Sequence, residues 1–392
     1  MTKMYVIQGG YIYTEDGVVR DGHIVVKDQR IHQIKHFPYQ GSLQVIDASG
    51  QHILPGFIDI HIHGGYGHDV MDASVEGLAA LSEGLLSEGT TSYLATTMTQ
   101  SNTAIHSALE TVATYVEQAQ ATPFKPAAEI LGVHLEGPFI SEHKVGAQNP
   151  AFVQRPSVQQ VQAFQKSANQ LIKIMTYAPE VEGAQETLAT LGNEIIFSMG
   201  HTVATFEQAT EAVAHGAKHV THLYNAATSF AHREPGVFGA AWTNPFLHTE
   251  IIVDGIHAHP AAVDVAYRMK GNHALYLITD AMRAKGLQDG EYDLGGQNVI
   301  VKGKEARLAS GALAGSILKM NDGLRNLLNY THAPLEELWR VTSYNQAKAL
   351  NVLSHKGSLT EGKDADIVIL NDDIEVLTTI KAGYVVNNNN NE

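Results

Sequence analysis

The chain has 392 residues, no cysteine, 21 histidines and a formal net charge of −15. The absence of cysteine excludes disulfides, thiolate metal sites, iron–sulfur clusters and a cysteine nucleophile, so any metal must be bound by histidine and carboxylate side chains. The acidic balance argues against nucleic acid or an anionic membrane surface as the main partner, whereas a small substrate with local charge is still allowed.

The composition points to a large folded protein. Hydrophobic residues make up 44% of the chain and charged residues only 17%, below the roughly 25% of an average globular domain. The N-terminal residues lack the apolar segment and cleavage site of a signal peptide, and no apolar run approaches the ~18 residues of a membrane span. We therefore expect a soluble, cytoplasmic protein.

Short alternating strands separated by turn signals occupy both ends of the chain. Each group is too small to bury its own face, so the simplest arrangement joins them. We expect a small β-sandwich domain formed by residues 1–53 plus 355–386. The asparagine-rich tail, residues 387–392, is expected to be disordered.

Between residues 54 and 354, short apolar runs alternate with helical ones, as in βα units with a parallel sheet. One clear helix is expected after Thr205, a candidate N-cap, with Gly216 as its stop. The candidate strands are Ile53–His63, Ser92–Met98, Ala128–Glu136, Ile172–Tyr177, Glu194–Gly200, His219–Leu223, Glu250–Asp254 and Ala274–Asp280. Such a series predicts an α/β protein with a (β/α)8 TIM-like barrel, whose chemistry lies where strands end and loops begin.

The first barrel strand carries two histidines on one face. Side chains alternate along a strand, so His61 and His63 lie on the face opposite Ile58, Ile60 and Ile62. Two imidazoles then converge at the carboxyl end of the strand. Taken alone, the pair fits a metal site and a pair of hydrogen-bonded polar residues equally well.

Other predicted strands end in the same residue types. His134 and Glu136 share a face, and His201, His222 and Asp280 lie at the ends of three later strands. One such residue is commonly a loop cap, but a set at successive strand ends predicts a metal site. The groups outnumber the ligands of one tetrahedral site. Either two metals are bound with Glu136 bridging, or one metal is bound and the other groups act as base and support.

Histidine and carboxylate ligands suit Zn²⁺, Fe²⁺ or Mn²⁺ without selecting among them. A divalent metal lowers the pKa of a bound water to about 7 and so supplies hydroxide at neutral pH. Asp280 is a carboxylate that can take the proton from this water and pass it to the leaving group. The residues therefore predict metal-assisted hydrolysis.

A series of motifs resembles the N-acetylglucosamine-6-phosphate deacetylases, a family of the amidohydrolase superfamily, and covers nearly the whole chain. In chain order they are PGFIDIHIHG, HLEGPF, MGHT, THLYNA, REPG, DGIH, ITDAM and LAGS. His-x-His alone is typical of the superfamily, whereas HLEGPF with THLYNA is much narrower. The resemblance implies a metal-bearing barrel that hydrolyses N-acetyl-D-glucosamine 6-phosphate to D-glucosamine 6-phosphate and acetate, in amino-sugar catabolism and recycling.

The resemblance also implies roles for individual residues. Asp280 is the expected catalytic acid/base. The expected metal ligands are Glu136, His201 and His222, with His61 and His63 as a second-metal pair. The expected substrate-binding residues are Ala147, Gln148, Asn225, Ala226, Arg233, His257, Leu313, Ala314 and Gly315.

Two of these assignments carry a further implication. Arg233 and His257 would supply positive charge to the 6-phosphate of the neighbouring subunit's substrate, which implies a homodimer. Gln148 stands where many family members have a histidine, and it can donate a hydrogen bond but cannot carry charge. Polarisation of the acetyl carbonyl would then depend more on the metal.

Two alternatives are open on the residues. Another metal-dependent amidohydrolase, such as a cyclic amidase or a deaminase, can use the same barrel. Such an enzyme has no need for Arg233 together with His257. A non-catalytic barrel homologue would have lost ligands, and none of the expected set is missing from the sequence.

Overall fold

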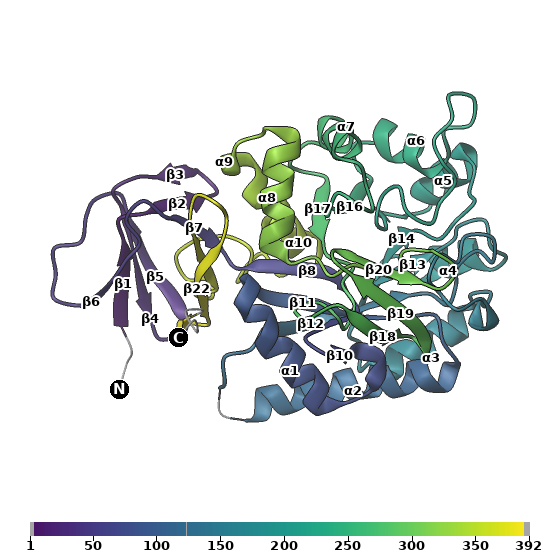
Figure 1. Cartoon of the computed structure of the whole chain (residues 1–392), viewed down its shortest axis with the longest axis horizontal. Helices are drawn as coiled ribbons and strands as arrows, with labels where there is room; N and C mark the ends of the chain where they lie inside the picture. The colour runs from purple at the N-terminus through teal and green to yellow at the C-terminus, as the bar shows by residue number, and fades with distance from the viewer. Residues whose placement is uncertain (1–3, 123, 388–392) are drawn as a thin grey trace.

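The computed structural model describes residues 4–122 and 124–387 of the chain. Two units lie side by side, a β-sheet unit made from both ends of the chain and a barrel made from its middle (Figure 1). The two ends therefore join as expected. The proposed domain limits, 1–53 plus 355–386 and 54–354, stay a prediction. Of the expected tail, Asn387 ends a strand and residues 388–392 lie outside the described residues.

The barrel is built on one parallel sheet in the order β17-β16-β15-β14-β13-β12-β11-β8. Its strands are β8 (Phe57–Ile62), β11 (Thr90–Thr97), β12 (Glu129–Glu136), β13 (Ile172–Tyr177), β14 (Ile196–Met199), β15 (His219–Val220), β16 (His248–Ile252) and β17 (Leu275–Ile278). At the open edges, the His63 N–H donates to the Ala281 carbonyl oxygen (2.9 Å), and the Thr279 hydroxyl donates to the Asp59 carboxylate (2.5 Å). These bonds close the sheet, and the expected barrel is confirmed.

Helices cover the outside of the sheet, with α1 to α3 at the bottom of Figure 1 and α5 to α7 at the top. They are α1 (Val75–Leu85), α2 (Asn102–Ala121), α3 (Val158–Ser167), α4 (Ala184–Leu191), α5 (Phe206–Ala214), α6 (Gly236–Thr243), α7 (Pro260–Lys270), α8 (Met320–Thr331), α9 (Leu335–Leu338) and α10 (Tyr344–Ala349). Short 3-10 helices are η1 (Val70–Asp72), η2 (Leu86–Glu88), η3 (Pro150–Phe152) and η4 (Trp339–Thr342). As predicted, Thr205 caps α5, where its side chain accepts from the Gln208 N–H. In the part of the chain that the structure describes, no helix has both the length and the apolar character needed to cross a membrane.

Two sheets form the β unit. One has the order β5-β4-β1-β6 and the other β23-β22-β21-β7-β2-β3. The strands are β1 (Met4–Gln8), β2 (Tyr11–Thr14), β3 (Gly17–Val19), β4 (His23–Lys27), β5 (Arg30–Lys35), β6 (Gln44–Asp47), β7 (His52–Pro55), β21 (Ile367–Leu370), β22 (Val376–Lys381) and β23 (Tyr384–Asn387). Antiparallel pairing of β7 with β21 joins the two ends of the chain, and side chains from both sheets share one buried core.

The first predicted barrel strand, Ile53–His63, is divided in the structure. Its first part is β7 of the β unit, and its second part is β8 of the barrel. The break falls at Gly56, where a Cβ atom would lie only 2.3 Å from the Thr91 side chain. Glycine is therefore required for the chain to pass from one sheet to the other at this close approach.

Two further small sheets lie at the mouth of the barrel. One pairs β9 (Gly64–Gly65) with β10 (His68–Asp69), and the other consists of β18 (Gly290–Leu294), β19 (Gln297–Lys302) and β20 (Glu305–Leu308). The β18–β20 sheet packs on Met98, Met282 and Ala314, and Figure 1 shows it in front of the barrel strands. It was not among the predicted strands, although Gly295-Gly296 between two alternating runs is a hairpin signal.

Candidate metal centre and active site

The expected metal ligands and acid/base converge at the carboxyl ends of the barrel strands. They are His61 in β8, His63 just after β8, Glu136 at the end of β12, His201 after β14, His222 after β15 and Asp280 after β17. Each of these residues is less than a tenth exposed. Parallel strands end on the same rim of a barrel, so local strand pattern and tertiary closure together produce this cluster.

Glu136 lies at the centre of the cluster. Its Oε1 is 3.2 Å from Nε2 of His201 and 3.1 Å from Nε2 of His222. Its other oxygen, Oε2, is 3.1 Å from Nε2 of His63, while Nε2 of His61 lies 3.4 Å from Oε1. One carboxylate thus contacts two histidine pairs.

These residues fit a divalent cation. Two groups of three, His61–His63–Glu136 and Glu136–His201–His222, each present ligand atoms within 4.8 Å of one another. Nε2 of His61 is buried without a hydrogen-bond partner among the described residues. Nδ1 of His201 donates to the Lys144 carbonyl oxygen (2.9 Å), which leaves the Nε2 lone pair facing the cluster. Because Glu136 is shared, the arrangement accommodates one or two ions.

Charge is balanced inside the cluster. Burial lowers the pKa of His63, but hydrogen bonds to Asp280 and Glu136 outweigh it and raise that pKa to about 10. Burial opposes ionisation of Asp280 as well, yet the histidines hold its pKa at about 2. Oδ1 of Asp280 is 3.2 Å from Nε2 of His63. Without a metal, Asp280 is therefore ionised and His63 holds a proton, which a bound cation would displace.

Three site residues have left-handed backbone conformations. The φ angles are +49° at His201, +29° at His222 and +48° at Asp280. Such conformations cost residues other than glycine of order 1 kcal/mol or more and concentrate at functional sites. Each of the three lies two residues past the end of a barrel strand, where the main chain changes direction.

His134 lies in the cluster but is not placed to bind a metal. Its Nδ1 donates to the Ile60 carbonyl oxygen (3.0 Å), so Nε2 accepts from the Thr176 hydroxyl (2.8 Å). Both nitrogens are therefore engaged. Burial keeps the pKa of His134 well below its usual range, and the ring stays neutral.

Gln148 contacts a metal ligand directly. Its Oε1 accepts from the Thr99 main-chain N–H (2.7 Å), and its Nε2 donates to Oε2 of Glu136 (2.6 Å). Since a main-chain N–H can only donate, the first bond fixes the orientation of the amide. The preceding carbonyl oxygen, that of Ala147, accepts from the Gln297 side chain in β19 (2.6 Å).

Two other predicted substrate segments border the cluster. The Asn225 N–H donates to the His222 carbonyl oxygen (3.0 Å), and the Ala226 carbonyl oxygen accepts from the Thr202 N–H (3.1 Å). Leu313, Ala314 and Gly315 lead to Ser316, whose N–H donates to the Asp280 carbonyl oxygen (2.8 Å). Gly315 has a φ of +63°, and a Cβ there would lie 2.8 Å from that same oxygen. The segment can therefore lie against Asp280 only with glycine at this position.

The two predicted phosphate contacts differ in environment. Nδ1 of His257 donates to the Asp254 carboxylate (2.6 Å), and that carboxylate also accepts from the His257 and Ile256 N–H groups. Arg233 is exposed in the segment between β15 and α6, which projects from the barrel at the upper right of Figure 1. Among the described residues, Arg233 has no ion-pair or hydrogen-bond partner. The structure does not bring it to the cluster of its own chain.

Sequence reasoning missed Glu250 in β16. It is completely buried, and its Oε2 accepts from Nδ1 of His61 at 2.9 Å. The available signal was a lone carboxylate at the start of the apolar run EIIV, in a predicted strand to which no role was given. A charge in such a strand is costly unless it has a partner.

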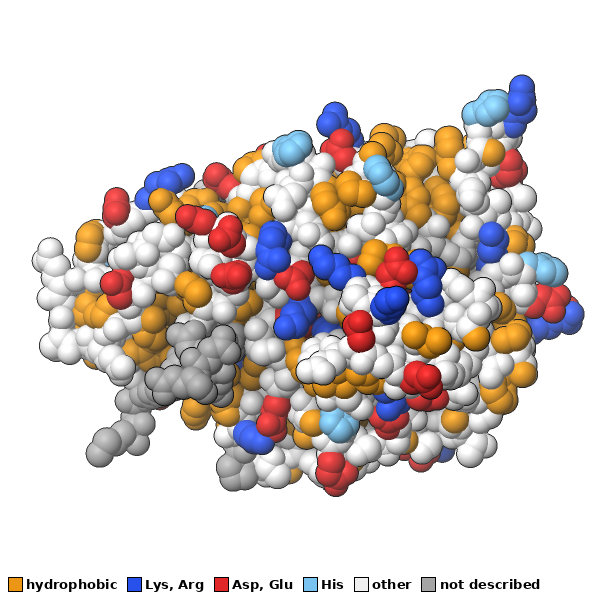
Figure 2. All heavy atoms as spheres, in the orientation of Figure 1, with side chains coloured by type: hydrophobic (Ala, Val, Ile, Leu, Met, Phe, Trp, Pro, Cys, Tyr) orange, Lys and Arg blue, Asp and Glu red, His pale blue; other side chains and the backbone are white. Residues whose placement is uncertain are grey.

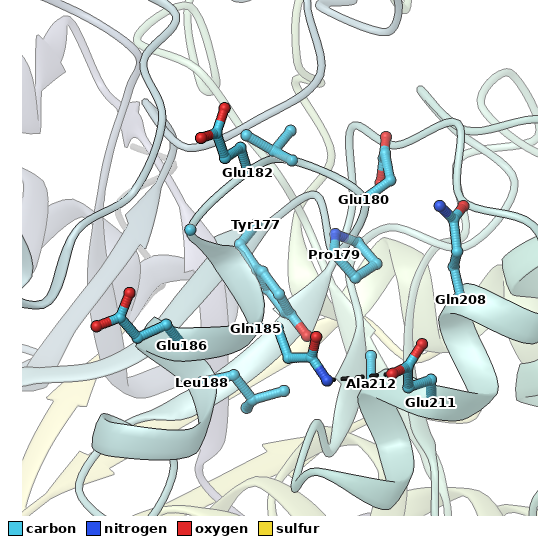
Figure 3. Close-up of a pocket in the computed structure, with 12 residues that line it drawn as sticks. Tyr177, Pro179, Glu180, Glu182, Gln185, Glu186, Leu188, Gln208, Glu211 and Ala212 are labelled. Atoms are coloured by element: carbon cyan, nitrogen blue, oxygen red, sulfur yellow. Dashed lines mark hydrogen bonds between the residues drawn. The ribbon is translucent and has the colours of Figure 1, made fainter.

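A separate pocket of about 380 Å³ lies between the end of β13, α4 and α5 (Figure 3). Its acidic side chains are engaged within the chain. Glu180 accepts from the Thr202 hydroxyl (2.5 Å) and the Val203 N–H (2.7 Å), and Gln185 donates to Glu211 (3.1 Å). None of the predicted site residues lines it, so the candidate chemistry belongs to the cluster around Glu136.

Comparisons with known proteins identify the family of the chain. The model of the amidohydrolase family matches residues 52–386. The N-acetylglucosamine-6-phosphate deacetylase of Bacillus subtilis (strain 168) is 44% identical over 390 residues, covering 98% of each chain. The crystal structure of the N-acetylglucosamine-6-phosphate deacetylase from Pasteurella multocida has a TM-score of 0.91 at 30% sequence identity. The match covers 98% of this chain and 100% of the Pasteurella chain. A mutant of the Mycobacterium smegmatis enzyme in complex with N-acetyl-D-glucosamine-6-phosphate has a TM-score of 0.90 at 28% identity, covering 98% and 99%.

Proposed function

The chain belongs to the amidohydrolase family, among the N-acetylglucosamine-6-phosphate deacetylases, and on this premise we propose that it hydrolyses the N-acetyl amide of N-acetyl-D-glucosamine 6-phosphate. The products are D-glucosamine 6-phosphate and acetate, as amino-sugar catabolism requires. The observation that carries the proposal is Glu136, which contacts both histidine pairs, with Asp280 beside them.

When bound, a divalent cation in this cluster supplies Lewis-acid polarisation of the acetyl carbonyl and lowers the pKa of a neighbouring water. The water oxygen adds to the acetyl carbon, and Asp280 accepts the proton that the water releases. Asp280 then donates this proton to the amide nitrogen as the carbon–nitrogen bond breaks. The ionised Asp280 described above is the state that the first of these steps needs.

The segments around the cluster support a sugar-phosphate substrate. Asn225 and Ala226 contact His222 and Thr202 at the cluster, and the glycine-containing segment that ends at Gly315 borders Asp280. These segments are the proposed sugar contacts. With Arg233, His257 is a proposed contact to the phosphate of the neighbouring subunit's substrate. Burial opposes ionisation of Asp254, but hydrogen bonds from His257 outweigh it and lower its pKa. Asp254 therefore fixes Nδ1 of His257 as a donor and leaves Nε2 for the phosphate.

A homodimer is part of the proposal. Arg233 lies on a projecting segment. Exposed hydrophobic side chains in this segment (Phe230), after α6 (Phe246) and in α7 (Val265 and Met269) favour cover by a second copy. Figure 2 shows hydrophobic side chains gathered over α6 and α7 at the upper edge of the molecule. In such a dimer, Arg233 of one subunit contacts the phosphate of the substrate that is bound in the other subunit. We place the enzyme in the cytoplasm, because a phosphorylated sugar does not cross a membrane unaided.

The deciding experiment is acetate release by purified protein, before and after metal removal, from N-acetylglucosamine with and without the 6-phosphate. We expect metal-dependent release with a large preference for the phosphorylated sugar. No acetate from either sugar by the metal-loaded protein would refute the proposal. Ammonia release or opening of a cyclic amide would favour a deaminase or a cyclic amidase instead.

A further inference from the structure

The side chain of Glu250 in β16 contacts one residue from each of the two histidine pairs of the metal cluster. Its Oε2 lies 2.9 Å from Nδ1 of His61 and 3.4 Å from the main-chain nitrogen of His222. His61 belongs to the His61–His63–Glu136 group, and His222 belongs to the Glu136–His201–His222 group. In sequence, Glu250 and His61 are 189 residues apart. The contact therefore depends entirely on the barrel.

The hydrogen bond determines which nitrogen of His61 can bind a cation. With Oε2 of Glu250 as the acceptor of this hydrogen bond, Nδ1 of His61 carries the proton and Nε2 is left to face the cluster. Nε2 lies 3.4 Å from Glu136 and 3.5 Å from Asp280, and it has no hydrogen-bond partner among the described residues. The pair has the carboxylate–histidine arrangement that orients metal ligands and raises their basicity.

A purely structural role does not account for Glu250. The side chain is completely buried, and within the described residues its carboxylate forms ion pairs with His61 and His134 only. Its Oε1 lies 4.0 Å from Nδ1 of His134 and makes no hydrogen bond. A buried carboxylate without a permanent cation destabilises a folded protein. The free-energy cost of burying the Glu250 carboxylate is offset when a cation is bound at Nε2, on the other side of the His61 ring.

We propose that Glu250 is a positioning residue, which orients His61 and sets the affinity of the His61–His63–Glu136 group for its cation. The proposal rests on the proposed function, since the cation is the one that this function uses. Glu250 does not touch the substrate. It acts through His61, and its effect is therefore measured on metal binding before it is measured on turnover.

The test is Glu250→Gln, which keeps the shape and an acceptor oxygen but removes the charge. Zn²⁺ is titrated into metal-stripped protein in competition with a chromophoric chelator. We expect the weaker of the two Zn²⁺ affinities, that of the His61–His63–Glu136 group, to fall about 10- to 100-fold. The melting temperature of the metal-free variant should stay equal to that of the wild type or rise, because an uncompensated buried charge is gone.

Asp366→Asn is the matched control. Asp366 is also a buried carboxylate, but it lies in the β unit with Lys356 (3.0 Å) and Lys381 (2.8 Å) as partners. We expect this variant to melt at a lower temperature with unchanged Zn²⁺ affinity. The proposal is overturned if Glu250→Gln weakens Zn²⁺ binding no more than Asp366→Asn does. Failure of wild-type protein to release acetate would refute the function and leave this comparison valid.

Discussion

The main-chain N–H of Asp280 donates a 2.8 Å hydrogen bond to the main-chain carbonyl oxygen of His61. This bond joins the ends of β17 and β8, which are the two edges of the barrel sheet. It also brings Oδ1 of Asp280 to 3.5 Å from Nε2 of His61 and 3.2 Å from Nε2 of His63. Closure of the barrel therefore delivers the proposed acid/base to the metal ligands.

Asp280→Asn should abolish most turnover while leaving the cluster able to bind its cation. An amide cannot take a proton from water and return it to the leaving nitrogen, so we expect kcat to fall about 10²- to 10⁴-fold. Metal content is measured by elemental analysis, and sugar binding by calorimetry. Turnover within tenfold of the wild type would remove Asp280 from the mechanism.

Arg233→Ala and Asp280→Asn should complement each other if Arg233 acts across a dimer. When the two inactive variants are mixed by reversible dissociation, about half of the dimers are mixed, and each mixed dimer holds one complete site. Activity should return to about a quarter of the wild-type value. If Arg233 served its own chain, no dimer would hold a complete site and the mixture would stay inactive.

Gln148→Met separates a role at Glu136 from a role at the sugar. The substitution removes a hydrogen bond to a charged group, worth about 1.5–3 kcal/mol, or roughly 10- to 100-fold. Because the Gln148 amide contacts Glu136, we expect the loss in kcat with KM nearly unchanged. A raised KM at normal kcat would assign Gln148 to the sugar instead.

Lys285→Met should strongly destabilise the protein. Lys285 and Glu88 are fully buried and 2.8 Å apart, and loss of the lysine leaves an unpaired buried carboxylate. The expected cost is about 3–5 kcal/mol, measured as a fall in melting temperature. Arg268→Ala, which breaks an exposed pair with Asp264, is the control and should cost less than about 1 kcal/mol. Equal falls in melting temperature for the two variants would contradict the conclusion that burial makes the Lys285–Glu88 pair costly to break.

His248 should make the protein acid-sensitive. Burial lowers the pKa of His248 from 6.5 to about 4, with Lys270 and Lys348 adding to the effect, and its Nδ1 is hydrogen bonded to the Tyr276 hydroxyl. The unfolded chain therefore binds this proton more readily than the folded chain. Stability is complete above pH 6.5 and is lost as the pH falls toward 4, by up to about 3 kcal/mol.

The measurement for this prediction is the melting temperature of metal-free protein at pH 7 and pH 5. In His248→Gln the temperature should fall less between these two values than in the wild type. Comparing the two proteins cancels the titration of the metal ligands, which is common to both. An equal fall in melting temperature in the two proteins would show that His248 does not contribute to the loss of stability in acid.

The local sequence pattern was sufficient to locate the eight barrel strands and the residues that meet at their carboxyl ends. Alternation places His61 and His63 on one face of β8, and apolar runs that end in His or Asp identify the rim where His201, His222 and Asp280 meet. Both signals come from neighbouring residues in one strand. For this reason the barrel and the cluster around Glu136 could be predicted before any contact was known.

Tertiary structure alone decided what supports these ligands. Whether a histidine near the cluster binds metal depends on partners from other strands, and His134 is engaged by Ile60 and Thr176. The contacts of Gln148 with Glu136 and of Glu250 with His61 likewise join distant segments. Sequence by itself determined which groups reach the rim. The hydrogen bonds that orient them are long-range, and no local periodicity encodes them.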